Sequence, residues 1–181
     1  MAGVLRVAVP GNPADRLSAL FDAHYERLYR LARRLTPTAD DALDLVQETF
    51  LRAARLPAAV PSGPASEEAW LVRVLVNIRR DQWRRTAMRR RHERDITPSS
   101  SLGADPEGAL VARALVWRAL DVLTPRRRAV LVMHELEGLP VPAIASLLGV
   151  SAITVRWHLS RGRRDLARVL GSAVGSCGRD R

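Results

Sequence analysis

Residues 141–169 read VPAIASLLGVSAITVRWHLSRGRRDLARV, and this stretch decides the fold. Apolar residues recur at helical spacing on either side of Gly149, which suits a turn that needs a positive φ. Ala145, four residues earlier, is small enough for two helices to cross there, and Ser151 can cap the second helix. The stretch therefore predicts a helix-turn-helix.

Two further helices are expected in front of this motif. The first carries apolar residues at helical spacing, namely Leu110, Ala114, Trp117 and Leu120. Thr124 and Pro125 then supply an N-cap and a first helical residue, and Gly138 and Pro140 end the second helix. Residues 109–171 are therefore predicted to form one small helical domain.

Residues 14–94 also show the spacing of buried helices rather than the alternation of strands. The apolar face of the first expected helix comprises Leu17, Leu20, Phe21, Leu28, Leu31 and Leu35. The residues of the second helix that we expect to point inward are Ala39, Leu43, Val46 and Phe50. The apolar residues of the third are Leu71, Val74, Leu75 and Ile78.

The breaks between these helices are marked by proline. Thr36-Pro37 ends the first helix, and prolines at 57, 61 and 64 force a loop before the third. Ser66 is expected to cap that third helix. The fold class is therefore all-α, with two small helical domains joined by a flexible linker and the helix-turn-helix in the second.

Charge divides the chain in the same way. All 29 basic residues are arginines and the net charge is +10, which favours a polyanionic partner. Residues 95–108 contain no arginine and are rich in Pro, Gly and Ser, as expected of a linker. Residues 172–181 include Gly and Ser and are expected to form a disordered tail.

Several classes of function are disfavoured. The single Cys177 excludes a disulfide framework within the chain, and four histidines without metal-ligand spacing give no metal site. Neither a phosphate-binding glycine loop nor a nucleophile elbow is found, so we expect no enzyme and no cofactor. No apolar run approaches the roughly 20 residues that span a bilayer. We therefore expect no membrane insertion and a soluble cytoplasmic protein.

The helix after Ser151 carries five arginines between residues 156 and 168. The residues expected on its outward side are Trp157, Ser160, Arg161, Arg164 and Arg168, with Arg156 and Arg163 at the edges. Arginine donates bidentately to guanine or neutralises phosphate, so this side suits a DNA major groove. A solvated basic face with an incidental tryptophan is the alternative.

A second basic segment, residues 79–94, holds eight arginines against two acids. Trp70, Asn77 and Trp83 lie beside it. Cations, aromatic rings and an amide together suit unpaired nucleic acid, whose backbone needs neutralising and whose bases need flat surfaces. The alternative is a charged helix end with tryptophans in the core.

The second helix has the opposite character. Its polar side comprises Asp40, Asp41, Asp44, Gln47 and Glu48. A negative strip on a basic protein does not suit DNA. It is either a solvated face with acids at a helix start or a surface that docks a basic protein.

Four motifs, in order, resemble those of bacterial RNA polymerase sigma factors. Residues 44–53, DLVQETFLRA, are similar to the signature D-x-V-Q-E-x-F-x-[RK]-A, and residues 69–77, AWLVRVLVN, to W-L-x-R-[IV]-x-x-N. Residues 123–139 resemble the family's L-P-x-x-x-R and E-L-E-G-L, and residues 154–161 resemble its recognition helix. With two domains and a short linker, the chain resembles the extracytoplasmic-function group of the sigma-70 family.

The resemblance implies a factor that binds core RNA polymerase and directs promoter recognition, DNA melting and transcription initiation. Asp44, Gln47 and Glu48 would bind the coiled coil of the β′ subunit, and the β flap would be a further contact. The residues implied at the minus-ten element, beside a base-capturing loop from residue 56 to 66, are Trp70, Asn77, Arg80 and Arg84. Those implied at the minus-thirty-five element are His134, Arg156, Trp157, Ser160, Arg161 and Arg164.

The linker would pass through the RNA exit channel, and an anti-sigma factor is a further candidate partner. A stand-alone helix-turn-helix transcriptional regulator is the alternative function. Such a regulator would also be basic and helical, but it would typically bind a palindrome as a dimer, without polymerase. An RNA-binding protein is a weaker rival, because no RNA-reading module is found.

Overall fold

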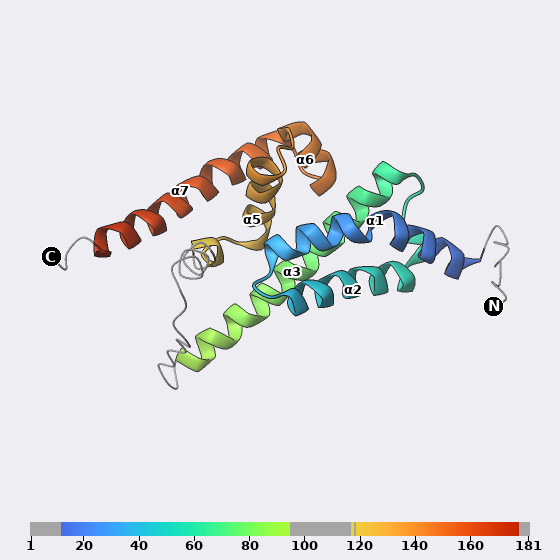
Figure 1. Ribbon diagram of the computed structural model, residues 1–181, viewed down its shortest axis with the longest axis horizontal. Helices are drawn as coiled ribbons and strands as arrows, with labels where there is room; N and C mark the ends of the chain where they lie inside the picture. Colours follow the sequence, from blue (N-terminus) through green and yellow to red (C-terminus); the bar gives the residue numbers. More distant parts are fainter. Residues whose placement is uncertain (1–11, 95–116, 118, 178–181) are drawn as a thin grey trace, which may run out of the picture. The chain divides into compact units, whose positions relative to one another are not determined.

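The computed structural model describes residues 12–94, 117 and 119–177, and within them the chain is helical, without strands (Figure 1). Its elements are α1 (Pro13–Leu35), α2 (Ala39–Arg55), the 3-10 helix η1 (Pro57–Ala59), α3 (Pro64–Arg94), α5 (Pro125–Leu131), the π-helix η2 (Val132–Leu136), α6 (Val141–Leu148) and α7 (Ala152–Cys177). The all-α prediction is confirmed.

The chain's contacts group into two compact units, residues 1–75 and 76–181, and α3 continues across the division. Each unit has its own buried residues. Trp117 and residues 119–121 are helical, whereas Leu110, Ala114 and the expected linker at 95–108 lie outside the described residues. The expected domain limits, 14–94 and 109–171, stay predictions.

The core of the first unit is built from α1, α2 and the first part of α3. Its fully buried leucines are Leu28, Leu31, Leu35, Leu45, Leu71 and Leu75. Burying one such side chain contributes roughly 1.5–3 kcal/mol, so these leucines supply much of the stabilisation. Two polar pairs also join α1 to α3: His24 Nε2 lies 3.4 Å from a Glu67 carboxylate oxygen, and Arg27 Nε donates to Glu68 at 3.2 Å.

The predicted break at Thr36-Pro37 is present. α1 ends at Leu35, and Thr36 Oγ1 donates to the carbonyl of Ala32 at 2.8 Å. Thr38 caps α2, because its hydroxyl oxygen accepts from the Asp41 backbone N–H at 3.0 Å. The short turn of residues 36–38 therefore returns α2 along α1 (Figure 1).

The inward face of α2 differs from the prediction, since Ala39 and Leu43 are exposed. The buried residues are Ala42, Leu45, Val46, Thr49, Phe50 and Ala53. At about 100° per residue, the apolar residues of α2 define two overlapping stripes, and only one of them can face the core. Thr49 joins the core because its hydroxyl is satisfied by the Leu45 carbonyl at 2.7 Å.

α3 begins earlier than predicted. Pro64 is its first residue, so Ser66 lies inside the helix and is not its cap. Gly63 precedes Pro64 with a φ of +98°, and its carbonyl accepts from the Glu67 N–H at 2.9 Å. Glycine adopts this φ without strain, and proline in a first helical turn forgoes no hydrogen bond. The Gly63-Pro64 pair therefore starts the helix.

The second unit contains the predicted helix-turn-helix. α6 ends at Leu148, Gly149 has a φ of +63°, and Ser151 Oγ accepts from the Thr154 N–H at 3.1 Å. The chain bends by 106° between α6 and α7. α7 packs against both α5 and α6, over buried residues that include Ala129, Met133, Ile144, Val155 and Leu159.

α7 extends farther than composition predicts. Residues 172–177 continue the helix, although the sequence pattern assigns them to a disordered tail. No proline interrupts this segment, and an existing helix elongates more easily than a new one starts. Residues 178–181 lie outside the described part of the chain. Among the described helices, no single one is both long and apolar enough to cross a membrane.

The backbone of α7 lies against a side chain of α5 at Gly162. A Cβ atom at residue 162 would stand 2.6 Å from Leu131 Cδ1 and 3.2 Å from Leu131 Cγ. Leu131 is itself buried, so its side chain has little space to move away. Glycine inside a helix costs about 0.5–1 kcal/mol relative to alanine. The close packing of α5 and α7 requires it here.

Gly162→Ala is expected to lower the free energy of unfolding by about 1–2 kcal/mol, because overpacking outweighs the gain in helix propensity. In a Leu131→Ala background the same substitution should be stabilising, because the new methyl group then fills vacated space. Chemical unfolding followed by circular dichroism measures both. Equal effects in the two backgrounds would show that the Leu131 contact is not the constraint.

Candidate protein- and nucleic-acid-binding surfaces

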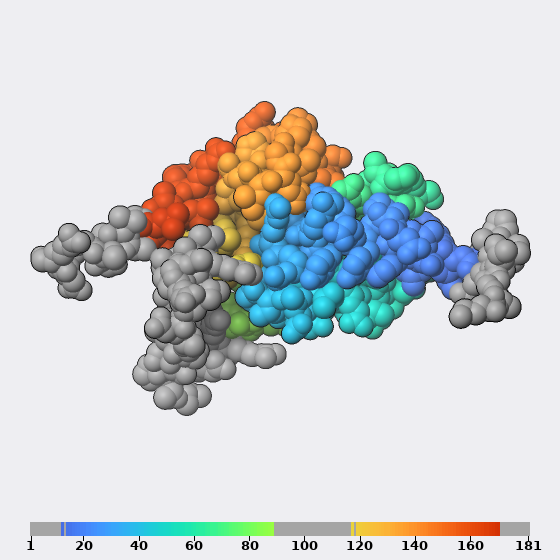
Figure 2. Space-filling view, viewed as in Figure 1, coloured from blue at the N-terminus to red at the C-terminus, as the bar shows by residue number. Residues whose placement is uncertain are grey.

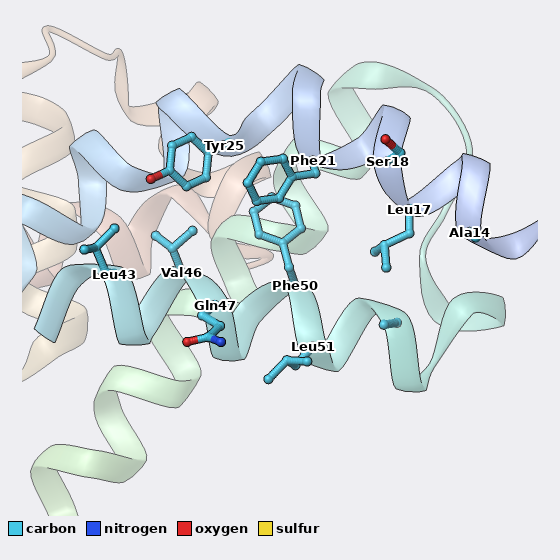
Figure 3. A pocket seen from close by; sticks show the side chains of 11 residues that line it. Ala14, Leu17, Ser18, Phe21, Tyr25, Leu43, Val46, Gln47, Phe50 and Leu51 are labelled. Carbon is cyan, nitrogen blue, oxygen red and sulfur yellow. The ribbon is translucent and has the colours of Figure 1, made fainter. Parts of the chain in front are cut away.

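An apolar groove runs between α1 and α2 on the first unit (Figure 3). It has a volume of about 560 Å³, and its walls include Leu17, Phe21, Tyr25, Leu43, Val46, Gln47, Phe50 and Leu51. Phe21 stacks on Tyr25 with ring centroids 4.8 Å apart and meets Phe50 at 4.9 Å. The two helices also lie side by side in the space-filling view (Figure 2).

Large apolar side chains stay open to solvent along this groove. Phe21, Leu43 and Leu51 are each 41–43% exposed. Leu43, expected in the core, is therefore a groove residue. Contiguous exposed apolar surface of this kind is typical of a site that another molecule covers.

The three predicted polymerase-binding residues lie together beside the groove. Gln47 forms part of its wall, on the α2 side with Leu43 and Leu51 (Figure 3). Asp44 and Glu48 both lie to one side of Gln47, and the three residues fall within an arc of about 100° around the helix. Glu48 lies 3.7 Å from Arg55, with both side chains well exposed, so this pair is weak. The groove thus combines apolar walls with an acidic edge.

Not every acid of α2 belongs to this edge. The Thr38 hydroxyl donates to the Asp41 carboxylate at 2.6 Å, and Thr38 in turn accepts from the Asp41 backbone. This reciprocal arrangement is a helix-start cap of the kind formed by threonine and an acid three residues later. Asp41 is therefore an acid that stabilises the start of α2, as one of the two explanations of the acidic strip expects.

The four residues predicted at the minus-ten element all lie on α3. Trp70, Asn77, Arg80 and Arg84 fall within an arc of about 80° and span about 21 Å of the helix. Trp70, Asn77 and Arg80 are half-buried and Arg84 is exposed. This face lies opposite the buried residues Leu71 and Leu75, so one continuous helix aligns the four side chains.

The contacts on this face of α3 bear on its two explanations, a surface for unpaired nucleic acid or a charged helix end with tryptophans in the core. Among the described residues, no hydrogen bond to the Asn77 side chain is found, so its amide is not used as a cap. Arg80 Nε and Nη2 both lie 3.4 Å from an Asp81 oxygen, which neutralises part of its charge. Trp83 lies about 140° around the helix from Trp70, away from this face. Both tryptophans are half-buried.

Arg16 of α1 holds the loop between α2 and α3. Its Nη2 donates to the carbonyls of Val60 at 2.8 Å and Pro61 at 3.4 Å, and its Nη1 donates to Pro57 at 3.5 Å. Three carbonyls of this loop thus share one guanidinium. Sequence reasoning missed this residue, because nothing in the local pattern links Arg16 to a loop more than 40 positions away.

α7 presents the residues predicted to meet the minus-thirty-five element. Arg156, Trp157, Ser160, Arg161 and Arg164 are all exposed. Val155, Leu159 and Gly162 are buried on the opposite side. The structure therefore brings these predicted residues onto one surface of a helix that follows a tight turn, as duplex recognition by a helix-turn-helix requires.

His134 lies on the π-helix η2 and not on α7. Its Nδ1–H donates to the carbonyl of Leu139 at 3.0 Å, which fixes the orientation of the ring. The neighbouring Glu135 accepts from Arg163 at 2.6 Å and 2.9 Å. η2 is thus tied to α7, and single-turn π-helices are frequent at functional sites.

Asp165 is a buried carboxylate that three arginines share. Arg127 donates to it at 3.0 Å, and guanidinium nitrogens of Arg161 and Arg168 lie 3.7 Å and 3.5 Å away. One negative charge cannot neutralise three cations, so the surface stays positive while its arginines are held in place. The spacing of Asp165 to Arg161 and Arg168 is a local one, but its contact with Arg127 of α5 joins two helices and has no local sequence signal.

Arg128 has a structural role. Its guanidinium lies 4.1 Å from the Trp117 ring centroid and 3.4 Å from Asp121, and the residue is 3% exposed. Burial lowers the pKa of Arg128 to about 10, with Asp121 opposing part of that effect. The guanidinium therefore stays charged at neutral pH. Among the described residues, no group of three or more His, Cys, Asp or Glu side chains is arranged to hold a metal ion.

Two segments of the chain match known families. Residues 20–89 match Sigma-70 region 2, and residues 113–166 match Sigma-70, region 4. The first match contains most of α1, all of α2 and the predicted minus-ten residues of α3. The second contains the helix-turn-helix and most of α7.

Individual proteins that are similar to this chain are also described as sigma factors. SigE of Mycolicibacterium smegmatis, an ECF RNA polymerase sigma factor, is 36% identical over 79% of this chain, and the chain spans 57% of its length. SigM of Mycobacterium tuberculosis is 35% identical, over 84% of this chain and 76% of that protein. SigL of the same species is 34% identical, over 87% of this chain and 90% of that protein.

Solved structures share the fold. The sigma factor RpoE from Bartonella quintana, in complex with the anti-sigma factor NepR, has a TM-score of 0.56 at 23% identity, covering 87% of this chain and 96% of that one. CnrH, in complex with the cytosolic domain of CnrY, has a TM-score of 0.58 at 26% identity, covering 90% and 91%. Together with the motifs and surfaces described above, these matches identify the chain as a member of the ECF family of RNA polymerase sigma factors.

Proposed function

We propose that the chain binds core RNA polymerase, directs it to promoter DNA and opens the duplex to begin transcription. The observation that carries this proposal is the acid-edged apolar groove on the first unit of a chain whose net charge is +10. A stand-alone helix-turn-helix regulator would account for α7. It would not account for this groove, nor for the match to Sigma-70 region 2.

The groove is the proposed docking site for the coiled coil of the β′ subunit. Apolar side chains such as Phe21 and Leu43 would be covered by a helical partner, and buried aromatic anchors usually supply most of an interface's binding energy. Asp44 and Glu48 would meet basic residues at the rim, which orient the partner and speed association. Gln47, in the groove wall, would hydrogen-bond at the centre.

The minus-ten site is proposed on the outward face of α3. Trp70 would offer a ring for stacking, Arg80 and Arg84 would neutralise backbone phosphates, and Asn77 would hydrogen-bond an exposed base edge. Extruding a base costs a few kcal/mol, which such contacts must offset. Arg16 would support this capture indirectly by holding the loop that precedes α3.

The minus-thirty-five site is proposed on α7. Arg156, Arg161 and Arg164 would contact guanine edges or phosphates, with Ser160 between them. His134, fixed through Nδ1, would face the DNA backbone beside α7. The β flap would be a further polymerase contact, and the linker would pass through the RNA exit channel.

An anti-sigma factor is proposed as a regulatory partner. The support is that RpoE of Bartonella quintana was solved with the anti-sigma factor NepR, and CnrH with the cytosolic domain of CnrY. A protein that covered the groove or α7 would block polymerase or DNA, respectively. Such a partner would act by competition.

Reversing the acidic edge tests polymerase docking. Asp44→Arg with Glu48→Arg should weaken core binding at least tenfold, because basic rim residues of the partner would then meet like charge. Capture of the full chain by core polymerase measures this, with helicity checked by circular dichroism. Glu26→Arg is the matched control, since Glu26 is an exposed acid of α1 outside the groove lining. Equal capture of the double variant and the control would refute the docking role.

Asn77→Ala tests base capture. Holoenzyme carrying it should still bind duplex promoter but form less open complex, measured by permanganate reactivity of unpaired thymines. A pre-melted template should restore part of the loss, because strand separation has then been supplied. Gln82→Ala removes an amide from another side of α3 and should open promoters normally. If Asn77→Ala also opened promoters normally, the capture site would lie elsewhere.

Arg161→Ala tests duplex readout. If Arg161 pairs with a guanine, its loss should cost about 1–3 kcal/mol at that base pair and relax the preference there. Arg168→Ala, about two turns farther along α7, should mainly lower the slope of log affinity against log salt by about one unit. Binding of duplexes with single substitutions at several salt concentrations separates these effects. Uniform weakening on all sequences by Arg161→Ala would assign Arg161 to a phosphate.

A further inference from the structure

The outward side of α7 begins with two apolar residues. Ile153 and Trp157 are 75% and 52% exposed, although both side chains are large and apolar. They stand four positions apart, so their side chains are neighbours on one face of the helix. The buried Val155 and Leu159 lie on the opposite side, so Ile153 and Trp157 point away from the core of the unit.

The Trp157 ring is held in place despite its exposure. The guanidinium of Arg127 lies 5.2 Å from the ring centroid, and the His158 ring meets the indole edge-on with centroids 4.9 Å apart. Arg127 is in turn anchored by its 3.0 Å hydrogen bond to the buried Asp165. An exposed aromatic side chain with fixed neighbours loses little conformational freedom on binding, which favours a recognition role.

The surroundings of this apolar pair indicate a polyanion as its partner. Arg156, Arg161 and Arg164 are exposed on the same side of α7. Ile153 is the second residue of the helix, and in a helix-turn-helix the N-terminal residues of the second helix contact base edges. The pair therefore occupies the part of the helix that would enter a major groove, with cations placed for the phosphates.

We propose that Ile153 and Trp157 read the methyl group of thymine in the major groove of the minus-thirty-five element. The C5 methyl of thymine is the apolar group that the four base pairs present in that groove. An isoleucine side chain has no hydrogen-bonding group, so it can select a base only through such a contact. This inference rests on the proposed promoter-binding function and adds Ile153 as a specificity-determining residue.

The test compares thymine with deoxyuridine, which lacks only the C5 methyl group. Holoenzyme reconstituted from the full chain and core polymerase first enriches preferred minus-thirty-five elements from a randomised duplex. Each thymine of the enriched element is then replaced by deoxyuridine, one position at a time. At one or two positions the wild type should bind the uracil duplex about fourfold more weakly, as expected for the ~0.8 kcal/mol of one buried methyl group.

The variants make the assignment specific. Ile153→Ala or Trp157→Ser should bind thymine and uracil duplexes equally at a position where the wild type distinguishes them. Leu170→Ala, which removes an exposed apolar side chain far along the same helix, should keep the wild-type difference. Both tested residues are exposed, so their loss leaves the core intact.

Three results would overturn the inference while leaving the proposed function in place. In the first, the enriched element contains no A·T pair. In the second, the wild type binds every uracil duplex as tightly as the thymine duplex. In the third, the Ile153 and Trp157 variants distinguish thymine from uracil as strongly as the wild type does. Variants that select DNA normally but lose a protein partner would assign the pair to a protein interface. Failure of the holoenzyme to enrich any element would instead refute the proposed function, and the inference with it.

Discussion

The contact between Gly162 of α7 and Leu131 of α5 determines which side of α7 faces outward. A Cβ atom at residue 162 would stand 2.6 Å from Leu131 Cδ1, so this side of α7 lies on α5 without strain only with glycine there. Once Gly162 and Val155 face inward, the 3.6-residue period directs Trp157 and Arg164 outward. The same rotation brings Asp165 within 3.0 Å of Arg127. One packing constraint thus sets the binding surface of the second unit.

Individual acids have different roles, as Asp165 and Glu135 of the second unit and Asp44 of the first unit illustrate. In the second unit Asp165 and Glu135 hold arginines of α5 and α7, and this fixes cations that would otherwise repel one another. In the first unit Asp44 makes no ion pair among the described residues and stays exposed beside an apolar groove. A carboxylate that fixes arginines would serve the proposed DNA binding indirectly. A free one on an apolar rim suits a basic protein partner.

Local signals were sufficient for the turn before α7, since Gly149 and Ser151 mark the turn and cap that the structure contains. They misplaced the start of α3 and the end of α7. The face that α2 turns to the core was harder to predict. Leu43 fits the apolar spacing of α2, yet it is exposed and lines the groove beside the buried residues. Long-range polar contacts have no local sequence pattern by which they could be predicted. Arg16 is bonded to a loop 44 positions away and Asp165 to an arginine 38 positions away, so only the folded chain brings them together.

In the proposed complex with promoter DNA, apolar and charged contacts on α7 would contribute unequally to promoter choice. A methyl contact distinguishes bases by roughly 0.8 kcal/mol, less than the ~1–3 kcal/mol of a bidentate arginine, and phosphate contacts add affinity without selecting a sequence. Because Asp165 draws on the charge of Arg161 and Arg168, the attraction of this unit to DNA is lower than its arginine count suggests. A small unit with such contacts selects promoters effectively only when other contacts supply affinity. Docking of the groove on polymerase would supply this affinity. When polymerase and the factor bind the promoter as one complex, the second contact becomes intramolecular and the overall affinity exceeds that of either contact alone. If α7 binds the promoter as proposed, dependence on polymerase for DNA binding would follow from the modest strength of the α7 surface itself.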